Sequence, residues 1–144
     1  MSEVTQPTMS VLSLKASELS DSIRHMIAAR WIRSLRFGNQ LFKKVDPDQY
    51  YANYSKYIEN LMAKPDSLVR LAVLTDDKDV VLGFSVSRED VLDYVHVHTD
   101  HRRQGIGKAV LPKHFTTFTH LTFTATDIWR KNPKYRQLKF NPFA

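Results

Sequence analysis

The sequence contains no cysteine. This absence excludes a disulfide framework, a thiolate metal site and a cysteine nucleophile, and such a chain has no need of an oxidising compartment. We therefore expect no metal centre, and any nucleophilic or acid–base chemistry must come from other side chains.

Long hydrophobic runs are also missing. No apolar stretch approaches the roughly 20 residues needed to cross a bilayer, and residues 1–10 carry Glu3 without a cationic start followed by an apolar run, so a secretory signal is not expected. Repeats, linkers and low-complexity segments are absent from the sequence as well. We expect a soluble, cytoplasmic protein that does not engage a membrane.

Size and composition favour one globular unit. With 144 residues and 42% hydrophobic content, the chain can bury one core and is too short for two. The sequence therefore predicts a single domain over residues 1–144.

The charge balance is basic, with a formal net charge of +6 and a pI near 9.6. Such a balance suits an anionic partner, either nucleic acid or a polyphosphate cofactor. The cations are spread over several segments instead of forming one stripe, which favours solvated helix faces and a basic tail. Nucleic-acid binding by the first helix and the tail is therefore an alternative that we do not favour.

The first half of the chain alternates a strand with two helices. Residues 9–14 alternate as a strand does, and apolar residues at four-residue spacing predict an amphipathic helix over residues 19–38. Asp46 followed by Pro47 is a strong helix start, because aspartate caps the free amides and proline fits the first helical position. This second helix must stop before Pro65.

After the second helix the pattern changes from helical to extended. A polar turn joins two of the expected strands into a hairpin, and a third strand leads into a glycine-containing loop. The expected elements are strands at residues 68–75, 80–87 and 91–98, a helix at 106–114 limited by Pro112, a strand at 120–126 and a short helix at 132–138.

The loop between the third of these strands and the next helix reads Arg102-x-x-Gly105-x-Gly107. Glycines let the backbone approach a ligand closely, and the first free amides of a helix bind phosphate oxygens. A Walker A loop would need serine or threonine where Ala109 stands, and a dinucleotide fingerprint would need glycine where Val110 stands. The loop therefore belongs to neither of these classes.

The same loop resembles the cofactor signature of the GNAT superfamily, the acyl-CoA-dependent N-acetyltransferases. The likeness runs through residues 97–107, and the expected order of elements over residues 9–140 is the family's order. The resemblance implies an α/β fold with a mixed, mostly antiparallel central sheet flanked by helices, in which the last strands are reduced or missing.

The resemblance also implies acetyl-CoA as the cosubstrate and a set of residues that hold it. Val95 and Val97 would border the acyl group in the wedge between two strands, where a strand amide would polarise the thioester oxygen. The remaining cofactor-binding residues, which supply backbone amides and positive charge to the pyrophosphate, are Arg102, Arg103, Gln104, Gly105, Ile106, Gly107 and Lys108.

Candidates for proton transfer are less well defined. His96 and His98 lie on one face of the expected strand and titrate near neutrality, so each suits an acid or a base; each can equally be an ordinary strand residue. Asp93 is expected on the opposite face. Residues 134–140 parallel a family segment that places Tyr135 as the acid that protonates the thiolate, although a simple packing role fits Tyr135 nearly as well.

These observations predict an N-acetyltransferase acting on an unknown amine, either of a protein or of a small molecule. The family continues with two more strands after the position of Phe140, whereas only residues 141–144 follow here. An alternative is therefore a catalytically inactive GNAT-like binding or assembly protein, for example a viral structural or regulatory component. An uncovered sheet edge at this end would also favour a homo-oligomer.

Overall fold

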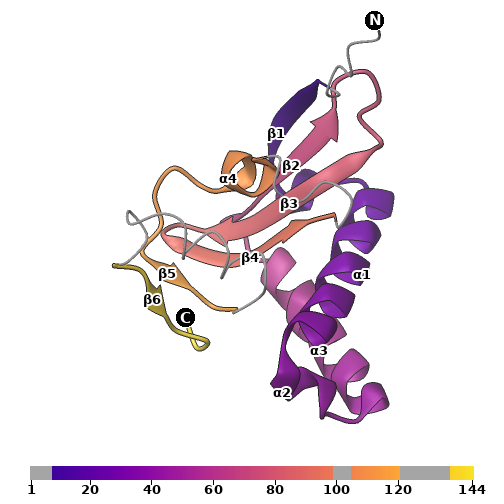
Figure 1. Cartoon of the computed structure of the whole chain (residues 1–144), viewed down its shortest axis with the longest axis vertical. Helices are drawn as coiled ribbons and strands as arrows, with labels where there is room; N and C mark the ends of the chain where they lie inside the picture. The colour runs from indigo at the N-terminus through magenta and orange to yellow at the C-terminus, as the bar shows by residue number, and fades with distance from the viewer. Residues whose placement is uncertain (1–7, 99–104, 121–136) are drawn as a thin grey trace, which may run out of the picture.

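The computed structural model describes residues 8–98, 105–120 and 137–144. Strands and helices follow one another largely as the sequence predicts (Figure 1). The elements are β1 (Met9–Lys15), η1 (Ala16–Glu18), α1 (Asp21–Gly38), α2 (Gln40–Lys43), α3 (Pro47–Met62), β2 (Ser67–Leu74), β3 (Val81–Arg88), β4 (Val91–Val97), α4 (Ile106–Val110), β5 (Thr117–Phe118) and β6 (Lys139–Phe140).

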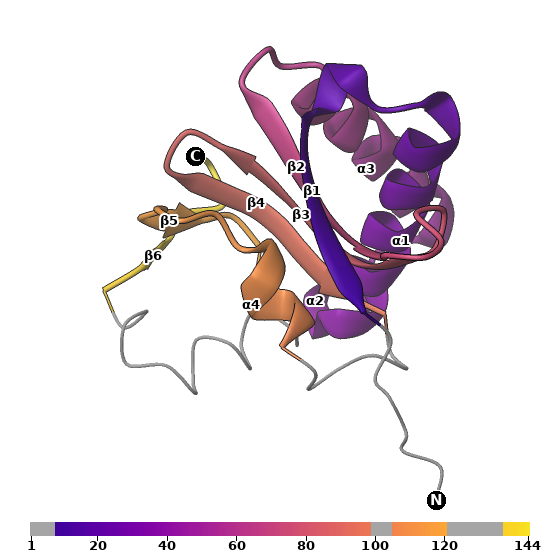
Figure 2. The same ribbon diagram turned by 90° about the horizontal axis from the view of Figure 1, so that it is seen from above.

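One sheet holds all six strands in the order of the sequence. Strands β1 to β4 pair in antiparallel fashion, while β5 runs parallel to β4 and β6 runs parallel to β5. Helices α1 and α3 cover one face of the sheet and α4 covers the other (Figure 2). The predicted mixed, mostly antiparallel sheet flanked by helices is confirmed.

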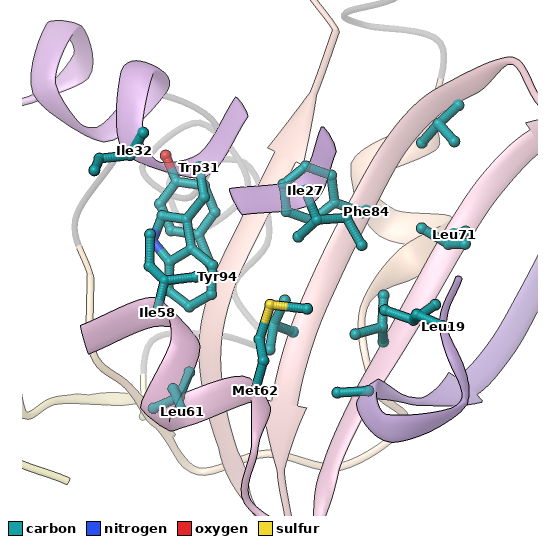
Figure 3. Close-up of a cluster of buried hydrophobic side chains, with 14 of the residues drawn as sticks. Leu19, Ile27, Trp31, Ile32, Ile58, Leu61, Met62, Leu71, Phe84 and Tyr94 are labelled. Carbon is teal, nitrogen blue, oxygen red and sulfur yellow. The ribbon is translucent and has the colours of Figure 1, made fainter. Parts of the chain in front are cut away.

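Helix α1 forms where the four-residue apolar spacing predicts it. The Ser20 side chain accepts a hydrogen bond from the Ile23 amide and caps the helix, which satisfies one of the free amides of the first turn. Ile27, Trp31 and Leu35 are fully buried, and Figure 3 shows Ile27 and Trp31 in the core cluster. This packing holds α1 across the strands that carry the candidate site.

Helix α3 begins as the sequence predicts, with Asp46 accepting from the Gln49 amide and Pro47 in the first turn. Its tyrosines pack at the core and its rim. Tyr50 is almost fully buried and donates from its hydroxyl to the Ile32 carbonyl at 2.5 Å, whereas Tyr51 remains exposed. Helix α3 is thereby tied directly to α1.

Two expected elements differ from the structure. The helix after the glycine loop ends at Val110 and not at residue 114, because Leu111 is extended (ψ 142°), as a residue before a proline tends to be. Ahead of the strand expected over residues 120–126, Thr117–Phe118 pair with β4 as β5, and His120 itself lies outside a strand. Residues 121–126, and nearly all of the expected helix at 132–138, lie outside the described residues.

No helix in the described ranges is long and apolar enough to pass through a membrane.

Candidate functional site

Strands β4 and β5 are joined over a short distance only. Their parallel register pairs Val91 with Thr117 and Leu92 with Phe118, and the Thr119 amide then donates to the Leu92 carbonyl at 3.1 Å. Within the described residues this is the last backbone hydrogen bond between the two strands, while β4 continues to Val97. The second half of β4 pairs with β3, and no backbone hydrogen bond to another described strand is found on its other side; we call this side the open edge of β4.

The open edge of β4 carries backbone groups that point away from β3. The His98 amide donates to the Leu82 carbonyl at 2.8 Å, and the register pairs His96 with Phe84. Alternate residues of an antiparallel strand direct their backbone groups to the same neighbour. The amides and carbonyls of Val95 and Val97 consequently point away from β3, where an extended ligand can pair with them.

A register irregularity interrupts β4 just before this edge. Val86 pairs with Tyr94, but the next residue of β3 pairs with Leu92, so Asp93 is the extra residue of a β-bulge. The bulge breaks the alternation of faces: Leu92 and Val95, three residues apart, both join the cluster around α4. The expectation that Asp93 lies on the face of the strand opposite His96 and His98 assumed that side chains alternate between the two faces without interruption.

Asp93 points towards α3 and is held by an ion pair. Its carboxylate receives two hydrogen bonds of 2.8 Å from Arg88. Burial raises the pKa of Asp93, and the Arg88 guanidinium opposes that rise. Burial and the neighbouring Asp93 carboxylate raise the pKa of Tyr57 in α3. Asp93 is thus occupied by a structural pair beside the bulge.

The glycine loop enters α4 through a left-handed residue. Gly105 caps the helix with φ 79°, a conformation that glycine adopts at little cost. Ile106 is buried beside Val95 and Val97 in one cluster, while Lys108 is exposed. Six of the nine predicted cofactor-binding residues, including Gly107, thus lie in β4 and at the start of α4, and Val95, Val97 and Ile106 pack in one cluster. Arg102, Arg103 and Gln104 lie outside the described residues.

A second glycine, Gly83 in β3, allows α4 to approach the sheet. A Cβ atom at this position would lie 2.8 Å from both the His96 carbonyl oxygen and the Ile106 Cγ2. The Ser85 hydroxyl adds a hydrogen bond to the Val110 carbonyl at the other end of α4. The absence of a side chain at Gly83 therefore lets the start of α4 pack closely on β3 and β4.

The predicted proton-transfer residues are placed only in part. His96 is almost buried, at 9% exposure, and its ring lies 5.5 Å from that of Phe84 on the face covered by α1 and α3. His98 follows β4 and is half-buried. Tyr135 lies outside the described residues. The two histidines therefore lie in the last part of β4 and directly after it. Their predicted role together with Tyr135 in proton transfer stays a prediction.

His120 is a further buried residue near the site, at a position where the sequence indicated only an ordinary strand residue. The side chain is 9% exposed, and its Nδ1 lies 2.7 Å from the Asp93 carbonyl oxygen. Because a carbonyl oxygen only accepts hydrogen bonds, Nδ1 carries the proton. Burial lowers the pKa of His120 to about 4, although the hydrogen bond that the Asp93 carbonyl accepts from the ring acts in the opposite direction. A histidine within a run rich in β-branched residues gave no signal of this position.

Comparisons with known proteins give structural matches only, because no family model matches the chain and no curated protein matches its sequence. One match is the ribosomal-protein-alanine N-acetyltransferase of Brucella melitensis, at 14% identity and a TM-score of 0.45, over 93% of this chain and 80% of that one. A metagenomic aminoglycoside acetyltransferase in complex with sisomicin has 18% identity and a TM-score of 0.42, over 92% and 75%. An aminoglycoside N-acetyltransferase in complex with CoA has 13% identity and a TM-score of 0.42, over 96% and 80%.

The topology itself agrees with the resemblance of the loop. Four antiparallel strands, a helix that begins after Gly105, and a fifth strand parallel to the fourth occur in the expected order. The order of these elements is the one implied by the resemblance of the loop to the GNAT superfamily. The open edge of β4 beside the glycine loop is therefore the candidate site.

Proposed function

We propose that the protein is an N-acetyltransferase that moves an acetyl group from acetyl-CoA to an amine. The observation that carries the proposal is the open edge of β4 beside the glycine loop. An extended pantetheine chain can add to this edge as a further strand does, through hydrogen bonds with the backbone of Val95 and Val97. The side chains of the two valines pack with Ile106, so edge and loop form one unit.

The loop would hold the pyrophosphate end of the cosubstrate. The left-handed Gly105 (φ 79°) turns the chain into α4, and close approach of phosphate oxygens suits a backbone that carries no side chain at that residue. The exposed Lys108 supports the proposal with a positive charge on α4, close to Gly105. Further amides and charge would come from Arg102, Arg103, Gln104, Ile106 and Gly107.

The proposed chemistry needs two proton transfers. The amine nitrogen attacks the thioester carbonyl, the carbon–sulfur bond then breaks, and the CoA thiolate leaves. His96 or His98, acting through water, would take the proton released by the amine, and Tyr135 would protonate the thiolate. His120 is a poor base for this step, because its lowered pKa of about 4 makes its conjugate acid much stronger than an ammonium ion.

The test uses the absence of cysteine from the chain. Release of the CoA thiol can be followed with a thiol reagent without any background from the protein. Acetyl-CoA is incubated with a panel of amines that includes a polyamine, an aminoglycoside and a peptide with an N-terminal alanine. We expect amine-dependent thiol release, and a matching increase of 42 Da in the acceptor, with at least one member of the panel.

The proton-transfer assignments are tested in the same assay. A Tyr135→Phe, His96→Ala, His98→Ala variant should release thiol about 10²-fold or more slowly, the range expected for general acid–base catalysis. A Lys78→Ala variant, changed at an exposed position between β2 and β3, serves as the control. Unchanged turnover in the triple variant would overturn the roles of these residues. Tight acetyl-CoA binding without turnover on a broad panel would instead support a binding protein that lacks catalysis.

A further inference from the structure

Strand β1 forms one edge of the sheet, and among the described residues no strand pairs with it on the side away from β2 (Figure 1). It pairs with β2 along its whole length without a register irregularity. The strand contains no proline, and its one charged residue is Lys15 at the end. Edge strands are commonly protected from further pairing by charges, prolines, bulges or short length. Between Met9 and Ser13, β1 has none of these protections.

The direction of the backbone groups of β1 follows from a hydrogen bond at its start. The Thr75 amide donates to the Thr8 carbonyl at 2.8 Å, and this pair continues the register of the two strands. Alternate residues of an antiparallel strand direct their backbone groups to the same side, so the amides and carbonyls of Val11 and Ser13 point away from β2. The Lys15 amide has the same phase and donates to a carboxylate of η1 instead of to β2.

The side chains beside this edge leave room for a further strand. Val11 is 42% exposed and Ser13 is exposed as well. The cluster beneath α4 includes Met9 from β1 but neither of these two residues, while Leu12 and Leu14 pack against the core on the other face. An added strand would therefore find an apolar side chain, Val11, uncovered beside it.

Positive charge lies next to the same edge. Arg70 of β2 pairs with Ser13 in the register and is half-buried. Its Nη1 is buried without a hydrogen-bond partner, and no ion pair of Arg70 is found among the described residues. Strands are spaced by about 4.8 Å, so a residue added opposite Ser13 lies about 10 Å from Arg70. Extended glutamate and arginine side chains can bridge that span across the small serine.

We propose that the edge of β1 binds an extended acidic segment of another protein, which adds to the sheet as a further strand. Backbone hydrogen bonds to Val11 and Ser13 would hold the segment, and a carboxylate beside Ser13 would pair with Arg70. A second copy lacks this complementarity, because residues 9–15 carry no carboxylate and each chain has a net charge of +6. The inference does not depend on the proposed acetyl transfer, since β2 and β3 separate β1 from β4.

Two peptides and four variants test the proposal. The probe is a fluorescently labelled peptide of the length of β1 in which valine and glutamate alternate, and its control has lysine in place of glutamate. Val11→Pro removes an outward donor without removing a hydrogen bond to β2, and proline is tolerated at such positions of edge strands. Val11→Thr keeps that amide. Arg70→Met removes the guanidinium, and Lys56→Met removes the charge of an exposed lysine on α3.

The first readout is the dissociation constant of each peptide, measured by fluorescence anisotropy. Val11→Pro and Arg70→Met should each weaken binding of the glutamate peptide about tenfold, the effect of about one hydrogen bond to a neutral or charged partner. Val11→Thr and Lys56→Met should bind as wild type does, and the lysine peptide should bind more weakly to every protein. No binding of the glutamate peptide at millimolar concentration would overturn the proposal. A loss in Arg70→Met alone would overturn strand addition, and a loss in Val11→Pro alone would overturn the acidic character of the segment.

The second readout is amide hydrogen exchange followed by NMR. In the free protein the amides of Val11 and Ser13 should exchange faster than that of Leu12, which bonds to β2, and saturating glutamate peptide should slow the first two about tenfold or more. Binding without this slowing would overturn strand addition. Slow exchange of both amides without peptide would overturn the free edge, and a dependence on protein concentration would identify a second copy as its occupant.

Discussion

Replacing Gly83 by alanine should disturb both stability and the candidate site. The added Cβ would lie 2.8 Å from the His96 carbonyl oxygen and 2.8 Å from Ile106 Cγ2, and the carbonyl cannot rotate away. Overpacking of a core costs about 1–3 kcal/mol. For a chain of this length, a loss of about 2 kcal/mol lowers the melting temperature by about 6 °C. Urea denaturation of both proteins gives the free energy of unfolding directly.

The same substitution should weaken acetyl-CoA binding more than its stability loss explains, because Ile106 begins α4 directly after the glycine loop. Gly105→Ala is the matched control. A Cβ there meets nothing within 4 Å, but the φ of +79° strains alanine by about 1–2 kcal/mol. Gly105→Ala therefore changes the loop without pushing α4 from the sheet.

A double-mutant cycle isolates the steric cause. In an Ile106→Ala background, which removes the Cγ2 atom, the cost of Gly83→Ala should fall by about 1 kcal/mol. A Gly83→Ala protein as stable as wild type, or a cost that is the same in both backgrounds, would refute the close approach of α4 to β3 as the reason for glycine at this position.

Three further predictions concern the surroundings of the site. Arg88→Met leaves the Asp93 carboxylate buried without its partner and should lower the free energy of unfolding by about 3–5 kcal/mol near neutral pH. In denaturation experiments at pH 4–5 this loss should be smaller. Without Arg88 the pKa of Asp93, already raised by burial, rises further, and the carboxyl becomes neutral. Burial lowers the pKa of His120 in the folded protein from 6.5 to about 4, so the free energy of unfolding is unaffected by this group above pH 6.5 and falls by about 3 kcal/mol as the pH drops to 4. His120→Asn should remove this fall from a plot of the free energy of unfolding against pH. An unaltered plot would contradict the burial of a neutral His120. Asp46→Ala removes the cap on the Gln49 amide and should cost about 1 kcal/mol in thermal unfolding, with an equal melting temperature counting against the cap.

Much of the fold can be predicted from local signals in the sequence. The apolar spacing of α1 and the Asp46-Pro47 start of α3 depend on interactions within a few residues, and the structure confirms both helices. The sequence before and after Gly105 predicts a strand and then a helix, and the structure confirms both as β4 and α4. Periodicity and helix capping determine these elements, and both can be recognised without knowing which distant residues the element packs against.

The details that shape the candidate site depend on contacts between distant segments. The bulge at Asp93 moves residues to other faces of β4, and nothing in the alternation of its sequence indicates where the irregularity falls. The environment of His120 is built from α1, α3 and β4 together, so its burial and its lowered pKa follow only from the folded arrangement. The early end of α4 reflects Pro112, whose influence on Leu111 the sequence analysis underestimated.

The most direct test of the central claim is a titration of isotopically labelled protein with acetyl-CoA, followed through its backbone amides by NMR. An acyl-CoA on the open edge of β4 predicts the largest shift changes at Val95, Val97 and residues 105–108, with little change in the outer strand β1. Shift changes confined to other elements, or no change at millimolar acetyl-CoA, would contradict the assignment of this edge and its glycine loop as the acyl-CoA site.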